Sequence, residues 1–269
     1  MRHIRALFLS HGAPSSIEDT EWMAALEKLG EELGPVRGIV VLSAHWVAKE
    51  LHAGPLTPSP LIYDFFGFPE RLYRARYPAP PGSDLLEILK GLPGIGPITP
   101  APGRGLDHGM WVPLKGLFPS ADIPVLGLSL PGVDPARLYA LGQALAPLRD
   151  GGILVVGSGG MTHNLGALIA NERAPVVSWA QTFDHWVVEK IESGDIHSLI
   201  EFWKNAPNAP LAHPTTEHFA PLFVAMGAAG ENFQVSFPVD FFRYGSLSLR
   251  SVAFWSPEAS PDATLSLRA

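Results

Sequence analysis

The sequence contains no cysteine, which excludes disulfide bonds and thiolate metal sites. Any metal ion must therefore be bound by histidine, aspartate or glutamate side chains. A protein that needs no disulfides suits a reducing compartment, and we expect a cytoplasmic location.

Basic residues are scarce and form no long run. The chain has 19 Lys and Arg against 26 Asp and Glu, a formal net charge of -7. Nucleic acids and anionic membranes attract basic surfaces, so we expect neither as a partner. Long apolar runs are also missing, because Gly, Pro or a charged residue interrupts each one before the roughly 20 residues of a membrane helix. The apolar run within residues 4–10 is only about six residues long, below the ~7–15 residues of a signal-peptide core, and we expect it to be a strand.

Apolar runs that alternate with amphipathic stretches dominate the rest of the chain. With 46% hydrophobic residues, 269 residues can bury a substantial core. The alternation predicts an α/β fold, with a central, mostly parallel or mixed sheet flanked by helices. No repeat and no Ser/Gly linker divides the chain, so residues 1–269 are expected to form a single catalytic domain. The expected strands cover residues 4–10, 38–44, 122–130 and 153–157, with late β runs in 233–239 and 247–255, and the expected helices cover 18–34, 83–92, 134–149, 178–193, 195–205 and 214–228.

Three of the apolar runs lead to a histidine. His11 ends IRALFLSH, His45 follows GIVVLSA, and His163 follows ILVVGSGGMT. Ligands of open α/β sheets bind beyond the carboxyl ends of the strands, where such residues converge. One histidine of this kind would most often be a buried structural residue. Three together predict a shared metal site, to which each imidazole offers one nitrogen.

Two further segments offer groups to the same site. In HPTTEH, Glu217 and His218 would lie on the first turn of the expected helix 214–228. In DHG, His108 is either an acid/base beside the metal, oriented by Asp107, or the cap of a following helix. The GSGG run at 157–160 lacks the spacing of a nucleotide-binding loop, so we interpret it as a tight turn that places His163. The sequence contains neither a cysteine nor a G-x-S-x-G elbow, so it gives no support for nucleophilic catalysis.

Around these residues the sequence resembles the class III extradiol ring-cleavage dioxygenases of the protocatechuate 4,5-dioxygenase beta-subunit superfamily, in the DOPA dioxygenase-like branch. The resemblance extends over residues 10–248 and preserves the order of the segments. The matching segments are SHGAPS, LSAHW, IYDFFGFPERLYRARYPAP, GLDHGMWVPL, GSGGMTHNL, HPTTEH and YGSLS.

The resemblance implies an α/β fold with a non-haem metal at the carboxyl ends of the strands. His11 and His45 match the two metal-binding histidines of the family. His163 matches a histidine that acts as acid/base in ferrous members and lies within reach of the metal in the DOPA-like branch. For the remaining ligand, ferrous members supply a glutamate and the DOPA-like branch a histidine. Between Glu217 and His218 we favour His218, so the expected metal set is His11, His45, His163 and His218.

Two residues are assigned to the substrate by the same resemblance. His108 matches a histidine that lines the substrate and oxygen pocket, and we expect it to share the catalytic role with His163. Tyr244, the first residue of YGSLS, is assigned to substrate binding.

The implied reaction opens the ring of a catechol, DOPA or a similar compound, with O2 and yields a semialdehyde. Fe(2+) is expected for turnover because Zn(2+), which histidines also bind, has no redox chemistry. The alternatives are a zinc-dependent hydrolase and a non-catalytic metal- or ligand-binding protein of the same fold. The apolar stretch 233–255 is either an edge strand or an interface, so a homo-oligomer is possible.

Overall fold

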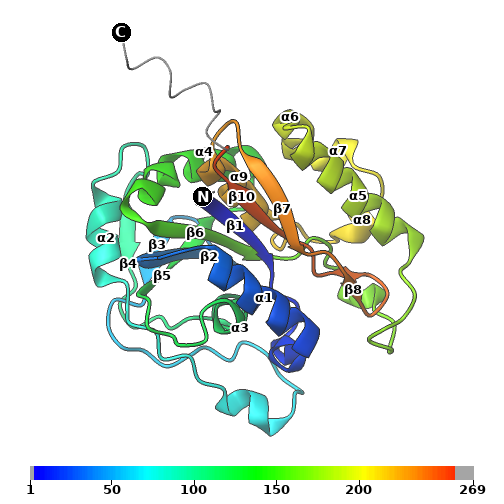
Figure 1. The fold of residues 1–269 in the computed structure, drawn as a ribbon, viewed down its shortest axis with the longest axis horizontal. Coiled ribbons are helices and arrows are strands. Elements are labelled where there is room, and N and C mark those ends of the chain that lie inside the picture. Colours follow the sequence, from blue (N-terminus) through cyan, green and yellow to red (C-terminus); the bar gives the residue numbers. More distant parts are fainter. Residues whose placement is uncertain (1–2, 258–269) are drawn as a thin grey trace.

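We analysed a computed structural model, in which residues 3–257 are described (Figure 1). Its framework is a mixed eight-stranded sheet in the order β4-β3-β5-β2-β6-β1-β10-β7. The four central strands, β5, β2, β6 and β1, are parallel, whereas β10 and β7 add antiparallel strands beyond β1. The sheet strands are β1 (Ile4–Ser10), β2 (Gly38–Ala48), β3 (Leu51–Gly54), β4 (Ile98–Pro100), β5 (Val125–Pro131), β6 (Ile153–Gly159), β7 (Gln234–Val239) and β10 (Ser251–Trp255), and a separate ribbon pairs β8 (Phe242–Arg243) with β9 (Leu247–Ser248).

Helices cover both faces of the sheet (Figure 1). α1 and α3 pack on one face, while α2, α4, α5 and α9 contribute to the core on the other. Asp19 caps the start of α1, and Asp134 with Pro135 starts α4. The helices are α1 (Thr20–Glu32), α2 (Ser83–Lys90), α3 (His108–Leu117), α4 (Pro135–Leu145), α5 (Ser178–Glu192), α6 (Ile196–Ile200), α7 (Phe202–Asn205), α8 (Ala209–Ala212) and α9 (Ala220–Ala229).

The period of two along each strand explains the two apolar layers. In β1, Leu7 and Leu9 face the core beneath α1 and α3, while Ala6 and Phe8 face the opposite core. All four side chains are fully buried. A sheet buried on both faces needs continuous apolar strands, and these were the runs visible in the sequence. The predicted α/β architecture is confirmed.

Several predicted boundaries are wrong. β2 extends to Ala48, so His45 lies inside the strand, and most of the GSGG run belongs to β6 instead of forming a tight turn. The expected helix 195–205 divides into α6 and α7 at Glu201. The largest difference is the expected helix 214–228, because residues 213–219 form turns and α9 begins only at Ala220. The short strands β3 and β4 were not predicted.

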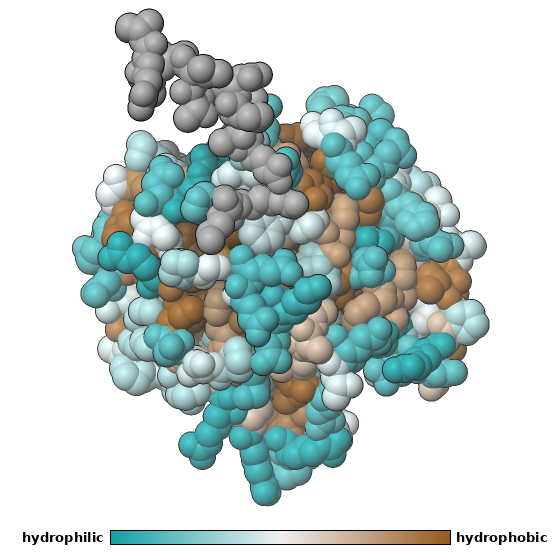
Figure 2. All heavy atoms as spheres, in the orientation of Figure 1, coloured by the Kyte–Doolittle hydropathy of each residue, from teal (hydrophilic) through white to brown (hydrophobic). Residues whose placement is uncertain are grey.

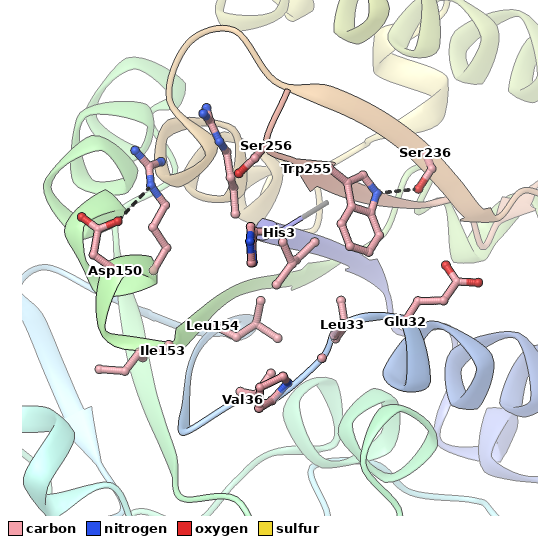
Figure 3. A pocket seen from close by; sticks show the side chains of 16 residues that line it. His3, Glu32, Leu33, Val36, Asp150, Ile153, Leu154, Ser236, Trp255 and Ser256 are labelled. Carbon is pink, nitrogen blue, oxygen red and sulfur yellow. Dashed lines mark hydrogen bonds and ion pairs between the residues drawn. The ribbon is translucent and has the colours of Figure 1, made fainter. Parts of the chain in front are cut away.

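A cavity of about 870 Å³ opens at the amino ends of β1 and β6, opposite the strand ends that carry the histidines (Figure 3). In its wall, Trp255 Nε1 donates a hydrogen bond of 2.9 Å to Ser236 Oγ. β7 is an edge strand of the sheet, which matches one of the two interpretations of the late apolar stretch.

The face in Figure 2 shows hydrophilic side chains around smaller apolar patches. Among residues 3–257, no helix combines the length and the apolarity that a bilayer crossing requires.

Candidate metal centre

The order of the strands in the sheet determines which histidines lie close together. β2, β6 and β1 are consecutive neighbours in the parallel part of the sheet. His11 directly follows β1, and its backbone N–H donates to the carbonyl of Gly159 at the end of β6, at 3.0 Å. His45 lies near the end of β2, and His163 follows β6 by four residues. The prediction that these strand ends meet is therefore confirmed.

Five histidine rings gather at this point. The ring centroid of His45 lies 5.0 Å from His11, 4.1 Å from His108 and 4.9 Å from His218. His163 stacks on His218 with centroids 3.4 Å apart and planes 5° from parallel. The structure thus brings together the five histidines that the sequence singled out for metal binding or catalysis.

Hydrogen bonds fix the tautomer of His11. Its Nδ1 lies 3.0 Å from Ser158 Oγ, and the Ser158 hydroxyl donates its proton to the carbonyl of Gly109. Because that hydroxyl proton is already used, Nδ1 of His11 must carry the proton that joins the pair. The lone pair of His11 Nε2 is therefore free.

Asp64 contacts two of the rings at once. Its Oδ1 accepts from His108 Nδ1 at 2.8 Å and from the His108 backbone N–H at 3.0 Å, while its Oδ2 lies 3.4 Å from His45 Nδ1. Burial by itself raises the pKa of Asp64, but the hydrogen bonds and charges of His108 and His45 outweigh it and lower the pKa to about 2. An ionised carboxylate only accepts, so His108 Nδ1 carries the proton of its hydrogen bond, and the carboxylate oxygen that faces His45 Nδ1 favours a proton there as well.

His218 has the same arrangement with a different carboxylate. Its Nδ1 lies 2.9 Å from Glu217 Oε1, and this hydrogen bond is the main reason why the pKa of Glu217 falls to about 2. Nε2 of His218 is buried and has no hydrogen-bond partner among the described residues. Glu217 therefore orients His218 through its Nδ1, which favours His218 over Glu217 as the candidate ligand.

The donor set fits a divalent cation. Nε2 of His11 and Nε2 of His45 lie 3.2 Å apart, and both carry lone pairs when their Nδ1 atoms donate. Burial, followed by the neighbouring histidines, lowers the pKa of His45 to about 3 and holds the pKa of His11 well below its usual range. Both rings are therefore uncharged at neutral pH, with one N–H each. A metal ion accepts such facing lone pairs, and a carboxylate or hydroxyl behind each ligand is typical of metal-binding histidines.

The possible ligand atoms form two groups whose members lie within 4.8 Å of one another. One group is His11, His45 and His108, and the other is His163, Glu217 and His218. The expected ligands His11 and His45 thus fall in one group, and His163 and His218 in the other. The assignment of individual residues as ligands or catalysts stays a prediction.

Two glycines allow the close approach. A Cβ on Gly109, in the first turn of α3, would lie 2.5 Å from Ser43 Oγ, 2.9 Å from His45 Cδ2 and 3.1 Å from His11 Cε1. A Cβ on Gly159 would lie 2.0 Å from the carbonyl oxygen of His218. Only a residue without a side chain lets α3 and the segment 213–219 pack this closely on the histidines.

The remaining sequence predictions have mixed outcomes. The prediction that Asp107 orients His108 is wrong. Asp107 pairs with Arg104 at 3.0 Å, and the carboxylate that accepts from the His108 ring is that of Asp64. His213, the first residue of HPTTEH, is fully buried and joins Met161 O through its Nε2 at 3.0 Å, so its role is structural.

Tyr244 borders a cavity of about 150 Å³ beside Arg243, and its assignment to substrate binding stays a prediction. Neither Asp64 nor Ser158 was predicted from the sequence. An acid among the aromatic residues of IYDFF was the available signal for Asp64.

Comparison with known proteins places this site in a family. A model described as the catalytic LigB subunit of aromatic ring-opening dioxygenase matches residues 2–254. The chain belongs to this family. It is 40% identical over 261 residues to a protein of Beta vulgaris and 36% identical over 253 residues to one of Escherichia coli, both named 4,5-DOPA dioxygenase extradiol. The alignments cover 93% and 92% of this chain and 96% and 93% of the relatives.

A solved structure agrees with these matches. The crystal structure of an uncharacterized protein from Escherichia coli K12 superposes with a TM-score of 0.79 at 32% identity, covering 93% of this chain and 99% of the other. These findings confirm the LigB-type fold and the DOPA dioxygenase-like branch of the extradiol class. The protein is therefore a metal-dependent oxidoreductase of the ring-opening dioxygenases. Neither a zinc hydrolase nor a non-catalytic binding protein is favoured.

Proposed function

We propose that this LigB-family protein is a ferrous extradiol dioxygenase that cleaves a catechol bearing an amino-acid side chain, DOPA or a close analogue, with O2. The observation that carries the proposal is the cluster of histidine rings whose Nδ1 atoms face Ser158, Asp64 and Glu217, which leaves their Nε2 atoms for a metal. The names of the relatives, 36–40% identical over nearly the whole chain, support the substrate class.

In this proposal His11, His45 and His218 bind the metal, with His163 close beside it. When bound, a ferrous ion supplies redox chemistry toward O2 that zinc lacks, so zinc in the site would inhibit ring opening. We also place the protein in the cytoplasm, where a reducing environment keeps iron ferrous.

His163 and His108 would move the protons. Burial, then the charge of His218, lowers the pKa of His163 to about 3, so its ring is neutral at pH 7 and can accept a proton from a catechol hydroxyl. His108 differs because Asp64 accepts a hydrogen bond from its Nδ1, which fixes the orientation of the ring. We assign His108 the return of a proton when the ring bond next to the hydroxyls breaks, giving a product that retains both O2 atoms.

Aromatic side chains beside His108 support an aromatic substrate. Phe65 meets the His108 ring edge to face at 5.7 Å, and Tyr73 lies 4.9 Å from Phe65. Offset and edge-to-face packing of this kind also suits a bound catechol ring.

Oxygen uptake tests the proposal. Protein loaded anaerobically with Fe(2+) should consume O2 when given DOPA and form a yellow product, with catechol and protocatechuate as comparison substrates. Zn(2+)-loaded protein and H45A should show only background uptake, because the first lacks redox chemistry and the second lacks a ligand.

A matched control separates this loss from a general effect of histidine removal. H197A changes an exposed histidine whose Nε2 lies 4.0 Å from Glu201, and its uptake should equal that of the wild type. No uptake with any catechol, although each chain holds one ferrous ion, would reject the proposal.

A further inference from the structure

We propose that Asp64 is a positioning residue that sets the tautomers of His45 and His108 together, so that one carboxylate prepares both a metal ligand and the histidine that returns a proton to the substrate. The inference rests on the proposed function for the roles of the two histidines. The geometry that it uses does not depend on turnover.

The two oxygens of Asp64 have separate partners. Oδ1 receives two hydrogen bonds from His108, one from the ring at 2.8 Å and one from the backbone N–H at 3.0 Å. Oδ2 faces His45 Nδ1 at 3.4 Å. The bond to the backbone also anchors the first residue of α3, because His108 begins that helix. Asp64 therefore joins the loop between β3 and α2 to both rings.

Metal binding by His45 through Nε2 requires a partner that keeps its proton on Nδ1. A neutral imidazole has one N–H, and a metal can bind only the other nitrogen. His45 Nε2 lies 3.2 Å from His11 Nε2, within hydrogen-bonding distance, and to bind a metal there it must present a lone pair, so its proton must reside on Nδ1. A carboxylate oxygen facing Nδ1 favours that tautomer, whereas an amide N–H in the same place favours the opposite one.

The substitution D64N separates the two roles. The amide oxygen of asparagine can keep both bonds to His108, which leaves its NH2 group facing His45 Nδ1. That NH2 group donates to Nδ1 and moves the His45 proton to Nε2, the atom required by the metal. We expect D64N to weaken metal binding about 10–100-fold, the usual loss when a partner behind a metal-binding histidine is removed, and to leave the His108 tautomer unchanged.

Two readouts test this without any ring cleavage. The affinity for Zn(2+) is measured by competition with a chromophoric chelator, for the wild type, D64N and E70Q. The control E70Q makes the same carboxylate-to-amide change in the same loop, at an exposed glutamate that pairs with exposed Arg74 at 3.3 Å, and should not change the affinity. Histidine 15N NMR then assigns the tautomers of His45 and His108 in the metal-free proteins.

The outcomes are distinct. Weaker Zn(2+) binding in D64N alone, with His45 changed to the Nε2–H form and His108 kept as Nδ1–H, would support the proposal. Unchanged affinity in D64N, or an Nε2–H proton on His45 in the wild type, would overturn it. The wild-type NMR result decides the question even where D64N folds poorly. Failure of oxygen uptake would reject the proposed function and leave these readouts intact.

Discussion

Gly109 lies where helix α3 comes closest to the histidine rings. An added methyl group would meet Ser43 Oγ, His45 Cδ2 and His11 Cε1 at 2.5–3.1 Å. The rings must move to relieve this overlap, so we expect G109A to weaken Zn(2+) binding by about tenfold or more, as expected when ligand geometry is disturbed. The measurement is the same chelator competition. G103A is the matched control, since nothing lies within 4 Å of a Cβ at Gly103, and equal affinities in the two variants would contradict the prediction.

Sequence reasoning at this scale found the histidines and missed their partners. Each of His11, His45 and His163 lies near a strand end, and strand ends can be recognised from local pattern. Asp64 is 44 positions from His108, and Ser158 is 147 from His11. Only the fold brings such distant residues together. This also explains why Asp107, the acid next to His108, was mistaken for the residue that orients it.

At the scale of elements, a buried ion pair joins α5 to the segment between β9 and β10. Asp184 in α5 is fully buried and accepts from Arg250 Nε at 2.9 Å and from Ser248 Oγ at 2.6 Å. D184A would leave the Arg250 guanidinium, itself largely buried, without its counter-charge. We expect a loss of about 3–5 kcal/mol of unfolding free energy, measured by urea denaturation.

An exposed ion pair provides the comparison for D184A. E189A removes one of the carboxylate partners of Lys190, at a separation of 3.6 Å in the same helix, while Asp195 stays paired with Lys190 at 3.4 Å, and should cost less than about 1 kcal/mol. If D184A were equally mild, the buried pair would not hold α5 in place.

Most elements were predictable because their apolar period is strong, and the exceptions have local causes. Within residues 213–219, the side chain of His213 and the carbonyl of His218 form hydrogen bonds with the loop after β6 instead of the pattern of a continuous helix. His213 Nε2 joins Met161 O, and the carbonyl of His218 accepts from the Gly160 N–H at 2.8 Å. The apolar run of α9 suggested a helix start too early in the sequence. β4 has only three residues, too few for any periodic signal.

For the whole molecule, we expect metal removal to lower the melting temperature. A ligand that binds only the folded state at 100 times its Kd stabilises the protein by about 2.7 kcal/mol. For a chain of this size that corresponds to a rise of roughly 5–10 °C. Differential scanning fluorimetry with Zn(2+), then with EDTA, should show the rise and its reversal.

The variant H218A provides the control for this shift. It removes one candidate ligand whose Nε2 has no hydrogen-bond partner within residues 3–257, so Zn(2+) should no longer raise its melting temperature to the same extent. An equal rise in H218A would show that the stabilising metal binds elsewhere.

The layers of the fold could be predicted from the sequence, but the order of the strands in the sheet could not. Alternating strands and helices predicted a mixed sheet with helices on both faces. Neither the insertion of β6 between β2 and β1 nor the antiparallel pairing of β10 with β1 could be read from the chain, because no local pattern specifies which strands become neighbours. The single domain over residues 1–269 stays a prediction, since residues 258–269 lie outside the described part.

The order of the strands also has a consequence for biosynthesis. His11 directly follows β1, yet the neighbours of β1 in the sheet, β6 and β10, begin only at residues 153 and 251, and His218 also lies far along the sequence. While the ribosome is still translating the middle of the message, His11 and His45 have no strand between them to hold them together. We therefore expect the complete metal site to form only after β6 and the segment that carries His218 have been synthesised.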